Sequence, residues 1–325
     1  MPQTIFPDPK GTTMARIGST DLDVSPLTLG GNVFGWTADE AESFAILDAY
    51  VAGGGNFIDT ADAYSAWVPG NSGGESEAII GRWMAARGNR DRLVIATKVS
   101  SHPERPGLSA DNIAAAAEDS LRRLGTDRID LYYSHFDKEP YAPVAETLGA
   151  YDALVKAGKV RHIAASNMTP ERLTESLDTS AREGLASYVA IQPNYNLVSR
   201  DTYEGPPADI AAERGLSAIP YYGLASGFLT GKYRPGANVD SARAGSAGKH
   251  LETERGRAVL AALDAVAARH DAELATIALA WLLAKPTVVS PIASARTVGQ
   301  LPALLAVADV KLSAEDVAEL DEASA

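Results

Sequence analysis

The sequence predicts an α/β protein built as a single (β/α)8 barrel. Eight short apolar runs alternate with longer amphipathic segments along the chain. Each short run is apolar or β-branched throughout, as expected for parallel strands that are buried on both faces. Repeated strand–helix alternation favours either a barrel or a doubly wound open sheet. The open sheet is the second candidate, because no Gly-x-Gly-x-x-Gly turn follows a strand.

The eight candidate strands are spaced so that a helix fits between most consecutive pairs. They are Pro26–Gly30, Asn56–Asp59, Leu93–Lys98, Ile129–Ser134, His162–Ser166, Tyr188–Gln192, Ser217–Tyr221 and Val288–Pro291.

The segments between the strands carry the apolar spacing and end signals of helices. Ser109 is a candidate N-cap, and Gly125 follows the end of the same helix. Pro143 and Pro170 stand in the first turns of two later helices. The expected helices are Glu40–Ala52, Glu75–Arg87, Ala110–Leu124, Pro143–Ala157, one that begins at Thr169–Glu171, Glu252–His270, Glu273–Ala284 and Val298–Ala306.

The ends of the chain and one long connection depart from this repeat. Residues 1–13 are expected to form an N-terminal extension, and Met14–Asp23 a short hairpin that closes the barrel floor. A long Gly-rich loop, between Tyr222 and the seventh helix of the barrel, is expected to cover the barrel mouth. Ser313–Ala325 is expected to form a capping helix. No linker rich in Pro, Gly or Ser divides the chain, so all 325 residues are expected to form one domain.

The composition limits the possible partners. Lys and Arg number 29 against 42 Asp and Glu, which gives a formal net charge of −13. A surface of this sign repels a phosphate backbone, so nucleic acid is not an expected partner, and an anionic ligand needs a local basic pocket. The absence of Cys excludes disulfides, thiolate catalysis and cysteine zinc sites. Neither a signal peptide nor an apolar stretch of about 18 residues occurs, so we expect a cytoplasmic protein that does not enter membranes.

Four polar side chains fall where consecutive candidate strands end. Asp59 ends the second strand, Lys98 ends the third, and His135 follows the fourth. Tyr64 lies on the loop that leaves the second strand. Active sites of (β/α)8 barrels lie at the carboxyl ends of the strands, so we expect these four side chains to face one cavity.

Together these four residues have the chemistry of an acid catalyst. A tyrosine phenol has an ordinary pKa of about 10 and is a poor proton donor at neutral pH unless a cation stabilises its phenolate. Lys98 is expected to supply that cation, and Asp59 to pair with the buried ammonium. His135 is expected to hold a substrate oxygen at Tyr64 through a hydrogen bond. The set therefore predicts general acid catalysis of carbonyl reduction.

Other interpretations of the same residues stay open. Taken singly, a Lys at a strand end is usually solvated, and a His there is usually structural. A metal site formed by His135, Asp137 and Asp59 is disfavoured, because Lys98 repels a cation and no metal-binding motif occurs. A barrel hydrolase that uses paired carboxylates is also disfavoured, because the sequence offers no convincing second carboxylate besides Asp59 at the mouth.

Reduction also needs a nicotinamide or flavin, because side chains cannot supply a hydride. Ser166, Asn167 and Gln192 follow or end strands five and six, and their hydroxyl and amide groups match a carboxamide. Tyr221, at the end of strand seven, can stack on a flat ring.

A phosphate site is expected at the loops after the last two strands. Ser294 and Arg296 precede a helix and form a candidate anion site. The glycines of residues 223–233 allow the backbone to approach a pyrophosphate, and Lys232 adds positive charge. No Walker motif or nucleophile elbow is present.

Several segments resemble motifs of the aldo-keto reductase superfamily, and the likeness spans most of the chain from about Met14. These segments are Gly55–Tyr64, Gly158–Asn167, Gln192–Asn196 and Gly227–Tyr233. The resemblance implies a TIM barrel that binds NADPH in an extended form without a Rossmann fold, which agrees with the missing glycine fingerprint.

The resemblance also implies roles for individual residues. Asp59, Tyr64, Lys98 and His135 correspond to the family's catalytic tetrad, with Tyr64 as the proton donor. The implied or candidate cofactor contacts are Gly31, Asn32, Asp59, Ser166, Asn167, Gln192, Tyr221, Leu224, Ser226, Gly227, Lys232, Ser294, Arg296 and Gln300.

Two positions depart from the family's pattern. Tyr222-Gly223 stands where members often carry Ser-Pro, and Gly299-Gln300 stands where they often carry Glu-Asn. Arg296 favours NADP over NAD, because a 2′-phosphate suits a guanidinium.

We therefore expect an NADP-dependent oxidoreductase that reduces an aldehyde or ketone to an alcohol. Phe34, Trp36, Trp67 and Tyr222 are candidate pocket residues, and aromatic rings suit an apolar or sugar-like ligand. The alternative is a nucleotide-sensing regulatory subunit with slow reductase activity, as in the potassium-channel β-subunit branch of the superfamily. Such a subunit should expose an apolar patch for its partner.

Overall fold

The computed structural model describes residues 14–234, 236, 239 and 244–325, so the expected extension at residues 1–13 lies outside the described residues. Its centre is an eight-stranded parallel sheet with the strand order β11-β10-β9-β8-β5-β4-β3-β12. The strands are β3 (Thr28–Gly30), β4 (Phe57–Asp59), β5 (Val94–Val99), β8 (Ile129–Ser134), β9 (Val160–Ser166), β10 (Tyr188–Gln192), β11 (Ser217–Ala218) and β12 (Ile292–Ala293).

The sheet is curled, and its two outermost strands are linked through the backbone. Ala218 in β11 forms a parallel bridge with Val288, which precedes β12. The N–H of Val289 donates to the carbonyl of Ala218 at 3.1 Å, and the N–H of Ile292 donates to the carbonyl of Pro220 at 2.8 Å. The structure is therefore an α/β fold with a curled, eight-stranded parallel sheet, and these contacts link the chain near its two outermost strands.

The last two strands differ from the prediction. β11 stops short of Tyr221, and β12 follows the expected segment Val288–Pro291 instead of coinciding with it. Proline explains both differences. Pro220 and Pro291 have no amide hydrogen and cannot donate to a strand ladder, which limits regular pairing at these positions.

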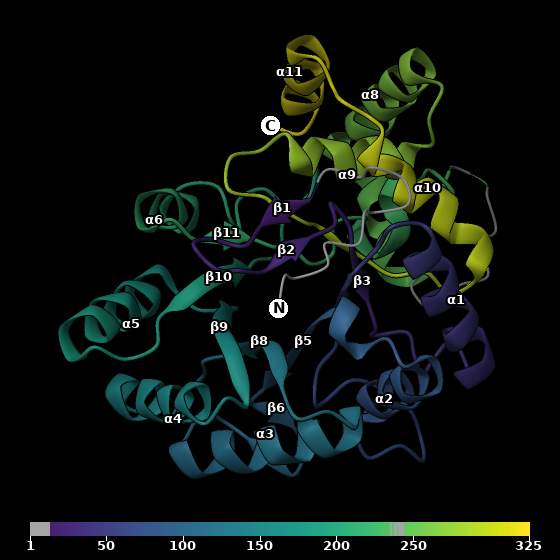
Figure 1. The fold of residues 1–325 in the computed structure, drawn as a ribbon. Helices are drawn as coiled ribbons and strands as arrows, with labels where there is room; N and C mark the ends of the chain where they lie inside the picture. Colours follow the sequence, from purple (N-terminus) through teal and green to yellow (C-terminus); the bar gives the residue numbers. More distant parts are fainter. Residues whose placement is uncertain (1–13, 235, 237–238, 240–243) are drawn as a thin grey trace, which may run out of the picture.

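Helices surround the sheet (Figure 1). Thr169 caps one of them by accepting the N–H of Arg172, and Gly125 ends another in the left-handed conformation. Ser109 precedes a helix as expected, but its side chain makes no capping hydrogen bond. The helices are α1 (Glu40–Ala52), α2 (Glu75–Arg87), α3 (Ala110–Leu124), α4 (Val144–Lys156), α5 (Pro170–Glu183), α6 (Pro206–Arg214), α7 (Ala244–Gly248), α8 (Glu254–His270), α9 (Leu274–Leu283), α10 (Leu301–Leu305) and α11 (Ala314–Ala323).

Some local elements were not predicted or differ in form. The expected helix Val298–Ala306 is a 3-10 turn followed by the short α10, with Pro302 in the first turn of α10. Helix α6 and an antiparallel pair, β6 (Ser101–His102) with β7 (Arg105–Pro106), were not anticipated. None of the described helices is long and apolar enough to span a bilayer.

The hairpin predicted near the N-terminus is present as β1 (Ala15–Arg16) and β2 (Asp23–Val24). The N–H of Gly18 in its turn donates to Ser217 Oγ at 2.8 Å, at the start of β11. Asp21 accepts one hydrogen bond from Arg161 and pairs with His162 at the start of β9. These contacts place the hairpin at the amino ends of the strands, opposite the ends that carry the candidate site.

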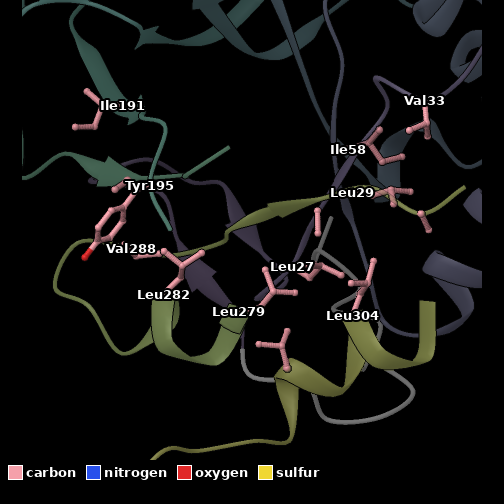
Figure 2. Close-up of a cluster of buried hydrophobic side chains, with 14 of the residues drawn as sticks. Leu27, Leu29, Val33, Ile58, Ile191, Tyr195, Leu279, Leu282, Val288 and Leu304 are labelled. Atoms are coloured by element: carbon pink, nitrogen blue, oxygen red, sulfur yellow. The ribbon is translucent and has the colours of Figure 1, made fainter. Parts of the chain in front are cut away.

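Alternation along the strands separates two apolar clusters. One side of the curled sheet contributes Phe57, Val94, Ala96, Leu131 and Tyr133 to a cluster that the N-terminal hairpin also joins. The residues between them in sequence face the helices. Figure 2 shows part of that larger cluster, where β3 and β4 meet α9 and α10; its labelled members are Leu27, Leu29, Val33, Ile58, Ile191, Tyr195, Leu279, Leu282, Val288 and Leu304.

Candidate active site

The same alternation positions the candidate catalytic residues. Asp59 lies two residues after Phe57 in β4, and Lys98 lies two residues after Ala96 in β5. Successive side chains of a strand point to opposite faces, so Asp59 and Lys98 share the face of the inner cluster at the carboxyl ends of their strands. His135 bears the same relation to Tyr133 in β8, and its N–H donates to the carbonyl of Val99 at 2.9 Å.

The ammonium of Lys98 is fully buried and has three acceptors. It donates to Asp59 Oδ2 at 2.6 Å, to the carbonyl of Thr60 at 2.7 Å and to Tyr64 Oη at 2.9 Å. These contacts account for its three hydrogens. The second carboxylate oxygen of Asp59 accepts from Gln192 Nε2 at 2.9 Å. The structure thus brings three of the four expected residues into direct contact.

The pKa of the Tyr64 phenol differs from the expectation that Lys98 makes this phenol more acidic. Burial, and next the charge of Asp59, raise the pKa of the Tyr64 phenol well above its ordinary value. Burial lowers the pKa of Lys98, and the charge of Asp59 opposes that effect. The phenol is therefore not acidic in this state of the protein. It is held in the protonated form, which is the form a proton donor needs before it reacts.

His135 completes the group. Its ring centroid lies 6.1 Å from that of Tyr64 in an edge-on arrangement. Burial lowers the pKa of His135 well below its ordinary value, and the charges of Lys98 and Lys138 add to the effect. The imidazole is therefore neutral at neutral pH and has one N–H to donate and one nitrogen to accept. Nδ1 is buried and has no hydrogen-bond partner among the described residues.

A cavity of about 770 Å³ opens at the carboxyl ends of the strands, and Tyr64, Asp59 and His135 line it. Lys98 does not line the cavity. It lies behind Tyr64 and Asp59, which line the cavity and accept its hydrogen bonds. Most of the residues expected to contact a cofactor line this same cavity. They are Asn32, Asp59, Ser166, Asn167, Gln192, Tyr221, Leu224, Ser226, Gly227, Lys232, Ser294, Arg296 and Gln300.

Two expected residues lie elsewhere. Gly31 does not line the cavity, because its N–H is bonded to the carbonyl of Asp59 at 2.7 Å and its Cα faces Ser76; its neighbour Gly30 lines the cavity instead. Phe34 is fully buried in the hydrophobic core and is not a pocket residue. The other three expected pocket aromatics, Trp36, Trp67 and Tyr222, do line the cavity.

The expected carboxamide contacts form one hydrogen-bonded group in the cavity wall. Asn167 donates to the carbonyl of His135 at 3.0 Å and to Ser166 Oγ at 2.9 Å, and it accepts from Tyr221 Oη at 2.8 Å. Ser166 in turn donates to the carbonyl of Gln192 at 2.9 Å. This network fixes the orientation of side chains at the ends of three different strand segments.

The far part of the cavity has the features of an anion site. The loop after β11 turns through left-handed residues at Tyr222, Ala225, Ser226 and Gly227, a backbone form that can turn N–H groups toward an anion. Lys232 and Arg296 also line the cavity and add positive charge. Ser294 donates to Asn32 Oδ1 at 2.7 Å, and Gln300 accepts the N–H of Arg296 at 2.8 Å.

Sequence reasoning missed several lining residues. Phe136 packs on His135 with ring centroids 4.8 Å apart. Ser101 and Pro103, on the β6–β7 hairpin, also line the cavity. These residues follow β8 and β5, so the strand-end rule that found His135 and Lys98 could have found them. Glu273 lines the cavity from just before α9, and no sequence signal points to it.

Comparisons with known proteins agree with this site. Residues 26–325 match the sequence model of the Aldo/keto reductase family. The chain is 34% identical to Protein tas of Escherichia coli (strain K12), over 94% of this chain and 96% of that protein. It is 33% identical to Uncharacterized oxidoreductase YrpG of Bacillus subtilis (strain 168), over 94% of each. It is also 33% identical to an aryl-alcohol dehydrogenase of Phanerodontia chrysosporium, whose name specifies NADP(+), over 93% and 83%.

The fold, the site and the match over nearly the whole chain define the class: this chain belongs to the aldo/keto reductase family. It is an NAD(P)H-dependent oxidoreductase, and its substrates are small carbonyl compounds. The resemblance found in the sequence is thereby confirmed.

Proposed function

We propose that this protein is an NADP-dependent reductase that converts an aldehyde or ketone into an alcohol, with Tyr64 as the proton donor. One observation carries the proposal. Tyr64 lines the cavity, and its hydroxyl accepts a hydrogen bond from the buried ammonium of Lys98 at 2.9 Å. A protonated phenol that is bonded to a cation can release its proton to a substrate oxygen, because the cation stabilises the phenolate that remains.

The other residues of the site support this proton transfer. Asp59 pairs with Lys98 at 2.6 Å and favours the charged form of the lysine. His135, as a neutral imidazole, donates a hydrogen bond to the carbonyl oxygen and holds it near Tyr64. The hydroxyl of Tyr64 makes only a long contact to Asp59, at 3.4 Å, so a substrate oxygen can replace it as the acceptor.

The residues of the cavity fit a nicotinamide dinucleotide phosphate. When bound, the nicotinamide supplies the hydride for the reduction. Ser166, Asn167 and Gln192 present fixed hydroxyl and amide groups for the carboxamide. Lys232 and Arg296 provide positive charge for phosphates in a chain whose net charge is −13. Arg296 is the residue we assign to the 2′-phosphate that distinguishes NADP from NAD.

An aromatic substrate fits the mouth of the cavity. Trp36 and Trp67 meet edge-on with ring centroids 5.6 Å apart, and Tyr222 and Phe136 also line the cavity. Rings in such positions bury flat apolar ligands well. A relative is named aryl-alcohol dehydrogenase, which agrees with this assignment. The exposed aromatics Trp67 and Tyr222 belong to this cavity, so they do not favour the alternative of a regulatory subunit with a separate docking patch.

We also propose that the sheet closes into a complete (β/α)8 barrel that forms one domain. The backbone hydrogen bonds between β11 and the segment before β12 support closure. One domain implies a single cooperative unfolding transition.

Cofactor binding followed by turnover tests the function directly. Quenching of intrinsic fluorescence gives dissociation constants for NADPH and NADH, and NADPH consumption is then followed over a panel of aldehydes, ketones and quinones. We expect tighter binding of NADPH than of NADH and the fastest turnover with aryl aldehydes. Tight NADPH binding with slow turnover of every carbonyl in the panel contradicts the proposal and favours the regulatory subunit.

A further inference from the structure

A second carboxyl group is buried close to the catalytic lysine. Asp62 is 1% exposed and follows β4 by three residues, and its backbone N–H donates to the carbonyl of Lys98 at 3.2 Å. Both of its carboxyl oxygens are buried, and neither has a hydrogen-bond partner among the residues that the structure describes. The site described above makes no use of this group.

The positively charged neighbours of Asp62 direct their hydrogen bonds to other acceptors among the described residues. The fully buried Glu77 of α2 takes the Nε–H of Arg123 at 2.6 Å, while Lys98 spends its three hydrogens on other acceptors. Tyr132 of β8 is buried nearby, and its hydroxyl also lacks a partner in the described part of the chain. The charged and titratable groups around Asp62 come from six elements. They are Glu77 from α2, Lys98 from β5, His102 from β6, Arg123 from α3, Tyr132 from β8 and Tyr151 from α4.

This environment favours a neutral carboxyl group. A buried carboxylate that accepts no well-formed hydrogen bond is costly, and the negative charge of Glu77 increases the cost. Burial, followed by the charge of Glu77, raises the pKa of Asp62 to about 8, while Arg123, the Ala63 amide and Lys98 act in the opposite direction.

We propose that Asp62 is a positioning residue that carries a proton at neutral pH, and that its ionisation sets the upper pH limit of the reduction. While Asp62 is neutral, Asp59 is the carboxylate that balances Lys98. Once ionised, Asp62 increases the proton affinity of Lys98 and adds negative charge near the phenolate that must form on Tyr64. Proton donation by Tyr64 then becomes less favourable. The catalytic part of this inference rests on the proposed function, whereas the buried proton does not.

Unfolding as a function of pH tests the buried proton without any assay of activity. Asp62→Asn keeps the shape of the side chain and cannot ionise. Between pH 5 and pH 7.5 the folded wild type holds a proton that the unfolded chain has released. The unfolding constant of the wild type should therefore rise about tenfold per pH unit relative to that of Asp62→Asn.

Urea denaturation at a series of pH values measures this ratio. Asp127→Asn, which removes an 88% exposed carboxylate, is the matched control and should give a ratio that is flat with pH. A flat ratio for Asp62→Asn as well overturns the proposal.

A measurement on the wild type keeps the proposal testable if Asp62→Asn does not fold. Infrared spectra of protein with carbon-13 label in the aspartate side chains should show a protonated-carboxyl band at pH 6 that shifts with the label. Titration should remove this band above about pH 9. Absence of such a band at pH 6 shows that no aspartic acid holds a proton and overturns the proposal.

The kinetic test compares alkaline pH profiles with NADPH and one good aldehyde. Above pH 8, the ratio of the kcat of Asp62→Asn to that of the wild type should rise by up to tenfold per pH unit. A ratio that stays constant from pH 7 to pH 10 refutes the catalytic part. If the wild type reduces no carbonyl at all, the proposed function has failed, and the urea and infrared experiments still decide whether Asp62 is protonated.

Discussion

At the scale of single residues, the ammonium of Lys98 satisfies a buried carboxylate and a phenol together. Lys98→Met removes it and leaves Asp59 buried, with Gln192 and the long contact from the Tyr64 hydroxyl as its remaining side-chain partners. Breaking one side of a buried ion pair typically costs about 3–5 kcal/mol. We expect the free energy of unfolding to fall by about that amount, as measured by urea denaturation, and carbonyl reduction to be lost.

Lys156→Met is the matched control for this substitution, because the side chain of Lys156 is 71% exposed. It should change the free energy of unfolding by about 0.5 kcal/mol or less. Equal losses for the two variants contradict the assigned pairing.

His135 gives the site a dependence of stability on pH. Its pKa is depressed in the folded protein, so the unfolded chain takes up a proton near the ordinary histidine pKa of about 6.5 while the folded protein does not. The associated stability is present above pH 7 and is lost as the pH falls. Relative to His135→Asn, the wild type should lose about 1.4 kcal/mol per pH unit below pH 6.

Urea denaturation of both proteins at pH 5, 6 and 7 measures this loss. A difference that does not change with pH means that His135 titrates normally in the folded protein.

At the scale of elements, the start of α2 depends on a glycine that makes room for an ion pair. Gly74 has φ 84°, and a Cβ there would lie 2.3 Å from Arg123 Nε, which is bonded to Glu77. Gly74→Ala therefore combines backbone strain with displacement of a buried charge pair. We expect a loss of about 2–4 kcal/mol in the free energy of unfolding, measured by urea denaturation.

Gly70→Ala separates these two causes. Gly70 has a similar φ of 93°, but no atom of the described residues lies within 4 Å of the added Cβ. This control should cost about 1–2 kcal/mol, from strain alone. If Gly70→Ala costs as much as Gly74→Ala, the contact with Arg123 is not the cause.

Local chemistry made most elements predictable. Strands β4, β5 and β8 are short and mostly apolar, and period-two alternation from Phe57 and Ala96 is enough to place Asp59 and Lys98 on one face. The same reasoning failed where long-range contacts decide. The sequence around Phe34 gives no sign that its ring enters the core, and Glu273 reaches the cavity only because α9 packs beside it.

At the scale of the whole molecule, a net charge of −13 opposes binding of any phosphate-bearing cofactor, so affinity must come from local positive charge. Arg296→Ala should raise the dissociation constant of NADPH at least about tenfold and leave that of NADH nearly unchanged. Fluorescence quenching with each cofactor measures both constants. Arg255→Ala is the control, because Arg255 lies in α8, pairs with Asp201 and does not line the cavity. It should leave both dissociation constants nearly unchanged. Equal weakening of NADPH and NADH by Arg296→Ala contradicts the assignment to the 2′-phosphate.

The central claim is that the hydroxyl of Tyr64, held by Lys98, gives the proton in carbonyl reduction. Tyr64→Phe removes this hydroxyl and keeps the ring. The most direct test is kcat for NADPH-dependent reduction of an aryl aldehyde by this variant, with NADPH binding measured in parallel. We predict a loss of at least about 100-fold in kcat with NADPH affinity unchanged. Turnover close to that of the wild type contradicts the account.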